Sequence, residues 1–277
     1  MLKILIGVLL SVFVLGLAGY FILAPASATP AVLYIEEGTV EVNAGKGWVA
    51  GVNEMELKNG AGVRTKEGEA TVVFMEGEML SLQPNTEVRL DKVTPKKVLV
   101  SQLAGETWNK ITKLSGITEY AISTPSTVAT VRGTEFFLND EELAVGDGEV
   151  QYGSHEKQSM VMVRKHKQAV KDKFVEEEMS DEQLAKMKKF PQKYMKVLKN
   201  VRAREIRKHK MLVDQLKKKS GMSEAELEKQ LEGIDEGAVD EDKLYSKVPG
   251  LLQPKAKRAY MLTKEIKKVR QQMKQQQ

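Results

Sequence analysis

The stretch Ser123-Thr-Pro-Ser-Thr-Val-Ala-Thr-Val-Arg-Gly-Thr-Glu-Phe-Phe-Leu138 holds the most specific information about the fold of this chain. Its Thr124-Pro125 pair predicts an extended start to a strand, because the proline ring fixes φ at about −65°. Gly133 predicts a tight corner with positive φ, where a β-carbon would be obstructed. Two interpretations of Arg132 and Glu135 are open. We favour a structural role for both side chains, in which Arg132 binds carboxylate or backbone carbonyl groups inside the domain. The alternative is that Arg132 faces an acidic ligand.

Short alternating runs of apolar residues surround this stretch, from Ala31 to Val163. They end at glycine or other turn residues about every ten positions, which is typical of strands. Pairs such as Val40 with Val42 bury one face of a strand and leave the other face exposed to solvent. The sequence therefore predicts an all-β domain over residues 30–165, and this alternation fits a coil of a solenoid or a sheet of a sandwich.

The residues around Gly133 also carry a family resemblance. Thr124-Pro125, Val128-Ala129 and the run from Val131 to Phe136 resemble the hallmark of FecR-type domains, and the match extends over about residues 38–152. The resemblance implies a right-handed, twisted β-solenoid outside the cytoplasm, frequently in proteins that pass or receive an envelope signal. It gives a structural role to the motif residues Thr124, Pro125, Val131, Arg132, Gly133, Thr134, Glu135 and Phe136.

The first 29 residues predict a membrane anchor or a signal peptide. The run Ile4–Ala24 holds no charge and is long enough to cross a bilayer, which we favour over a signal cleaved near Ala26-Ser27-Ala28. Lys3 is the only charge before the run, so the N-terminus is expected in the cytoplasm and the bulk outside it. FecR regulators hold a sigma factor with a cytoplasmic region, and only Met1-Leu2-Lys3 are available here for that role.

Residues 166–277 predict a basic helical region. Residues 161–277 contain 30 Lys and Arg against 18 Asp and Glu, whereas residues 1–160 have an acidic excess. Ser180 with Gln183, and Ser223 with Glu226, predict capping boxes, and Pro191 predicts a kink or a restart. Two interpretations remain open: a solvated helix face, or a surface for an anionic envelope polymer or protein partner. The candidate surface consists of Lys189, Lys193, Lys196, Arg202, Arg204, Arg207 and Lys208.

The sequence offers no pattern for catalysis. It has no cysteine, its three histidines lack metal-ligand spacing, and neither a nucleophile elbow nor a phosphate-binding loop occurs. We therefore expect no enzyme, no cofactor and no metal site. Nucleic acid is not an expected partner, because an exported domain does not ordinarily meet it and a stacking platform is missing.

These expectations combine into one architecture. The predicted fold class is α+β in separate parts: an N-terminal transmembrane helix, an all-β FecR-like twisted β-solenoid, and a C-terminal basic α-helical region. The predicted function is a membrane-anchored, non-catalytic envelope binding or scaffold module, whose cationic tail binds an anionic or protein partner. The alternative is a transmembrane signalling component that relays an envelope signal to a separate partner.

Overall fold

The computed structural model describes residues 31–275, except 75–76, 113–116, 132, 156–158, 211–213, 215–220, 222, 237–239, 247, 249 and 251–252. Its first part consists of short strands. They are β1 Ala31–Glu37, β2 Val40–Asn43, β3 Trp48–Ala50, β4 Glu56–Leu57, β5 Gly62–Thr65, β6 Glu69–Phe74, β7 Glu78–Leu82, β8 Glu87–Val93, β9 Lys97–Ala104, β10 Thr107–Lys110, β11 Glu119–Ser123, β12 Thr127–Val131, β13 Glu135–Leu138, β14 Glu142–Asp147, β15 Glu149–Ser154, β16 Met160–Arg164, β17 Lys167–Val170 and β18 Glu176–Glu178.

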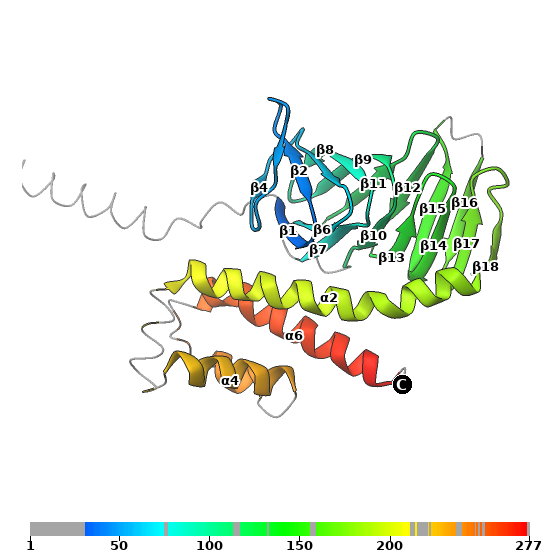
Figure 1. The fold of residues 1–277 in the computed structure, drawn as a ribbon. Helices are drawn as coiled ribbons and strands as arrows, with labels where there is room; N and C mark the ends of the chain where they lie inside the picture. Colours follow the sequence, from blue (N-terminus) through cyan, green and yellow to red (C-terminus); the bar gives the residue numbers. More distant parts are fainter. Residues whose placement is uncertain are drawn as a thin grey trace, which may run out of the picture.

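The strands form two nine-stranded sheets that face each other (Figure 1). Sheet A has the order β18-β17-β14-β13-β10-β7-β6-β1-β4, and sheet B has the order β16-β15-β12-β11-β9-β8-β5-β2-β3. The chain crosses from one sheet to the other after one or two strands, so both sheets grow together along the sequence. β17 and β18 extend sheet A beyond the expected domain boundary at residue 165, because β17 pairs with β14 and β18 with β17.

The core between the sheets follows the period-2 alternation of the sequence. β12 alternates buried and partly buried residues, with Ala129 and Val131 directed inward. Tyr120 of sheet B lies edge-on between Phe74 and Phe136 of sheet A, with ring centroids 6.4 Å apart in both pairs. Full burial of a large apolar side chain contributes about 1.5–3 kcal/mol, so such inward rows hold the sheets together.

The predicted twisted β-solenoid is wrong for this chain. A solenoid winds in one sense, which makes equivalent strands of successive coils run parallel. Among the strand pairs of the described residues, only β9 with β11 is parallel, and the others are antiparallel. Neither sheet closes or winds as a solenoid. The alternation of residues predicts which side of a strand is buried but not the direction of its neighbour.

Four described helices follow the sheets. They are α2 Asp181–Lys208, α4 Glu224–Asp235, α5 Glu241–Ser246 and α6 Gln253–Gln275. Ser180 accepts a hydrogen bond from the Gln183 backbone at the start of α2, while the Gln183 side chain donates to Glu142 instead of closing the predicted box. The capping box at Ser223 is complete. Pro191 lies within the continuous helix α2, at its third turn.

The helices are not a separate part, which corrects the rest of the predicted fold class. α2 and α6 lie across the outer face of sheet A (Figure 1), where one apolar cluster joins both helices to the sheet. Trp108 of sheet A contacts Phe190 of α2, with ring centroids 5.5 Å apart. The predicted span Ile4–Ala24 lies outside the described residues. Within the described ranges, no helix combines the length and apolarity that a membrane crossing needs.

Candidate functional site

The start of the hallmark is a tight turn that joins β11 to β12. The Thr124 backbone N–H donates to the Thr127 carbonyl at 2.9 Å, and the Thr124 hydroxyl accepts from the backbone N–H groups of Ser126 and Thr127. Pro125 is the second residue of this turn, a position that its fixed φ favours and where it need not donate. Thr124-Pro125 therefore reverses the chain, whereas the sequence suggested an extended start to a strand.

The rest of the hallmark is built into the fold. Val131 and Phe136 lie in the core between the sheets, and Gly133 has φ +74°, the conformation expected at that corner. The buried Thr134 hydroxyl donates to the Glu149 carbonyl at 2.8 Å, which connects the corner to β15. Glu135 accepts from the Lys110 ammonium at 2.8 Å in a half-buried ion pair. Arg132 lies outside the described residues.

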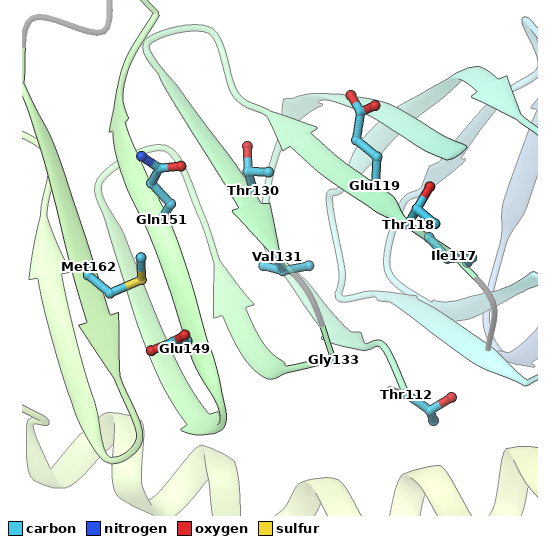
Figure 2. Close-up of a pocket in the computed structure, with 10 residues that line it drawn as sticks. All are labelled: Thr112, Ile117, Thr118, Glu119, Thr130, Val131, Gly133, Glu149, Gln151 and Met162. Carbon is cyan, nitrogen blue, oxygen red and sulfur yellow. The ribbon is translucent and has the colours of Figure 1, made fainter. Parts of the chain in front are cut away.

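A groove of about 670 Å³ opens beside this corner on the outer face of sheet B (Figure 2). Its floor crosses four neighbouring strands: β11, β12, β15 and β16. The lining mixes hydroxyl, amide and carboxylate groups with methyl groups and one thioether. The lining residues are Thr112, Ile117, Thr118, Glu119, Thr130, Val131, Gly133, Glu149, Gln151 and Met162.

Strand register brings these groove residues together. β11 pairs with β12, β12 with β15, and β15 with β16, so Thr130 lies opposite Gln151 and Gln151 opposite Met162. Glu119 forms an ion pair with Lys97 of β9 at 2.6 Å. No sequence motif singles out the groove as a site. Glu119, Thr130, Glu149, Gln151 and Met162 carry only the signal of outward positions in alternating strands, and nothing local says which strands become neighbours.

Most of the predicted cationic surface is turned toward carboxylates of the same chain. Lys193 is 11% exposed and pairs with Glu36 and Glu69 of sheet A, and its ammonium lies 5.4 Å from the Trp108 ring centroid. Arg204 pairs with Glu56 at 3.0 Å, at the edge of sheet A. These contacts bind α2 to the β part rather than leaving the charges for a partner.

The C-terminal half of α2 uses its other cations in the same way. Arg202 is buried and donates two hydrogen bonds, at 2.6 and 2.8 Å, to the Asp235 carboxylate of α4. Arg207 pairs with Glu54, and Lys208 lies 3.6 Å from the Glu205 carboxylate. Lys189 and Lys196 are exposed and form no ion pair with any residue of the described part. The structure thus separates the seven predicted residues into five that are paired within the chain and two, Lys189 and Lys196, that form no ion pair with a described residue.

Metal ligands do not gather in the described ranges. No group of three His, Asp or Glu side chains within them is arranged to hold a metal ion. His155 is instead hydrogen-bonded to the Thr124 carbonyl at 2.8 Å, next to the hallmark turn. The groove and the exposed cations are two candidate binding features of the described residues.

Comparison with known proteins assigns the central part of the chain. Crystal structures, at 1.65 and 2.50 Å resolution, of a "putative anti-sigma factor" from Parabacteroides distasonis ATCC 8503 are similar to 45% of this chain, at 15% identity and a TM-score of 0.38. The similar region is 62% of that protein's chain, less than two thirds of its length. A search of curated proteins finds no match. Residues 61–151, which contain the hallmark and most of the groove, match the family model "FecR protein". The chain therefore contains a FecR-family domain.

Proposed function

We propose that this chain is a non-catalytic binding or scaffold module of the cell envelope, which holds an extended segment of a protein partner in the groove of sheet B. The observation that supports it best is the unequal covering of the two sheets. α2 and α6 cover the outer face of sheet A (Figure 1), whereas the outer face of sheet B carries the open groove next to the hallmark corner.

The composition of the groove supports a peptide-like occupant. Thr130 and Gln151 lie side by side at its centre and offer a hydroxyl and an amide, both able to donate and accept hydrogen bonds. Met162 adds a flexible apolar wall, which suits partners of variable shape. At about 670 Å³ the groove falls within the usual range of ligand sites, roughly 300–1,000 Å³.

Location is part of the proposal. The uncharged run Ile4–Ala24 supports export from the cytoplasm, and the acidic β part and basic helices would then face the outside. Protease added to intact spheroplasts should degrade the folded part. Full protection of the chain until the membrane is lysed would place it in the cytoplasm and contradict this part of the proposal.

The partner proposal is tested by crosslinking in cells. A photo-crosslinking amino acid at Gln151 should give a discrete adduct, and the same group at Lys46, in an exposed loop after β2, should not. The captured protein is then purified, and its affinity is measured with the native chain and with Thr130→Trp, which fills the groove. We expect binding to weaken at least ten-fold without a change in melting temperature. Equal adducts from both positions, or unchanged affinity, would contradict the groove as the binding site.

A second candidate function is a signalling component that relays binding in the envelope to a separate partner. The FecR-family match favours it. If binding in the groove starts the signal, Thr130→Trp should reproduce the transcriptional changes caused by deleting the gene. A transcriptome that responds to deletion but not to Thr130→Trp would separate signalling from the groove.

A further inference from the structure

The structure divides the cations of α2 between two sides of the helix. Lys186, Lys193 and Arg204 lie along one border of its buried face. Lys193 and Arg204 reach carboxylates of sheet A, and Lys186 reaches Glu106 in the turn before β10. Lys188, Lys189 and Lys196 lie on the opposite side, exposed, with no ion pair to any described residue. We call these three residues the lysine stripe.

No carboxylate interrupts the lysine stripe. From Ala185 to Ala203 the exposed positions of α2 carry only alanine, lysine and amide side chains, namely Ala185, Lys188, Lys189, Gln192, Lys196, Asn200 and Ala203. At about 1.5 Å rise per residue, this carboxylate-free face is roughly 27 Å long. A merely solvated helix surface usually mixes both signs of charge, since opposite charges three or four residues apart stabilise a helix.

We infer that the lysine stripe docks on an anionic lipid surface. Lys188 and Lys196 are separated by about 12 Å along a rigid helix, so one small anion cannot contact both ends of the stripe. A plane of anionic headgroups meets all three ammonium groups at once, and Gln192 and Asn200 between them can donate to phosphate oxygens. This inference goes beyond the groove proposal, because α2 lies on the sheet A side and contributes no groove residue.

The start of the described chain supplies a second reason. Ala31, the first residue of β1, follows the end of the uncharged run Ile4–Ala24 by seven residues. Seven residues reach at most about 25 Å, so any contact of that run with lipid keeps β1 close to the same surface. β1 belongs to sheet A, the sheet that α2 covers.

The expected strength follows from the number of free lysines. Each lysine close to an anionic membrane contributes about five-fold in affinity, which corresponds to roughly 1 kcal/mol. Three lysines acting together therefore contribute roughly a hundred-fold, and salt should reduce this factor because the charges are exposed.

The test uses the full chain, which has no native cysteine, so an introduced cysteine is a unique labelling site. A dye is attached to Asn200→Cys, beside the stripe, or to Gln151→Cys in the groove as the reference. Vesicles carry a quencher on their headgroups and consist of phosphatidylcholine, alone or with a third of phosphatidylglycerol. We expect quenching at position 200, not at 151, only when phosphatidylglycerol is present.

Two charge-matched triple variants decide whether the stripe is responsible. Lys188→Gln with Lys189→Gln and Lys196→Gln should remove the quenching, whereas Lys46→Gln with Lys58→Gln and Lys92→Gln, exposed lysines of the β part, should leave it. Equal quenching in both variants, or at both dye positions, would overturn the inference. A change in the dye's fluorescence on adding soluble polyphosphate, without quenching by the vesicles, would overturn it too. That result would assign the stripe to an anionic polymer. None of these results affects the groove proposal.

Discussion

At the scale of single residues, the buried pair of Arg202 and Asp235 joins two of the helices. Their side chains are 8% and 2% exposed, and the contact fixes α2 to α4 with two hydrogen bonds. Asp235→Asn leaves the guanidinium group without its counter-charge in a buried place, so we expect the free energy of unfolding to fall by about 3–5 kcal/mol. Urea denaturation at one pH measures it.

The matched control for this prediction is Glu232→Gln, an exposed carboxylate on the same helix that forms no ion pair within the described residues. It should change the free energy of unfolding by no more than about 0.5 kcal/mol. Replacing both partners with apolar residues, Arg202→Met with Asp235→Leu, should recover most of the loss. If Asp235→Asn matches its control, the pair contributes specificity rather than stability.

Glu106 makes the stability of the folded protein depend on pH, and the direction of this dependence can be tested. Burial between α2 and sheet A raises the pKa of its carboxyl above 4.5, while the ammonium of Lys186, 3.2 Å away, opposes that rise. A raised folded-state pKa means that this group's stabilisation is present below pH 4.5 and lost as the pH rises through the folded value. The native chain should therefore lose stability relative to Glu106→Gln as the pH rises above 4.5. Urea titrations on both sides of that pH provide the measurement. If the native chain instead becomes more stable relative to Glu106→Gln as the pH rises, the ion pair with Lys186 outweighs the effect of burial.

At the scale of elements, the docking of α2 depends on where each lysine faces. Lys193 pairs with Glu36 and Glu69, whereas Lys189, four residues earlier, is exposed and free of ion pairs in the described part. Lys193→Gln should cost about 1.5–3 kcal/mol, the usual value of hydrogen bonds to charged groups, and Lys189→Gln close to nothing. Hydrogen exchange of α2 amides should quicken only in the first variant. Equal exchange in both would show that the apolar cluster alone holds the helix.

At the scale of the whole molecule, the helices and sheet A share one apolar interior. Removing residues 181–277 would expose an outer face of sheet A that includes Val32, Tyr34, Trp108 and Phe137. An apolar patch of this kind promotes association. We expect residues 31–180 to keep a β-type circular dichroism spectrum but to self-associate and bind a hydrophobic dye, unlike residues 31–277. A monomeric fragment that does not bind the dye would show that the helices are not needed to keep the outer face of sheet A from associating.

The sequence by itself determined several local features of this protein. Alternation predicted strands such as β12, Gly133 predicted a corner with positive φ, and Ser223 with Glu226 predicted a complete capping box. The hallmark residues predicted the FecR-type domain, which the family match over residues 61–151 confirms. Each of these signals depends on residues within a few positions of one another, because backbone dihedrals, side-chain alternation and caps are set by neighbours along the chain.

Only the tertiary structure decided how those elements combine. It replaced the solenoid by two facing antiparallel sheets, placed α2 on sheet A, and brought Thr130, Gln151 and Met162 to one groove. It also decided which lysines are free, since Lys193 finds Glu69 from 124 positions away and Lys189 finds no described counterpart. The physical reason is that burial and charge pairing are properties of surfaces that meet in space. Lysines four residues apart look equivalent in the sequence, yet one faces a carboxylate and the other faces solvent.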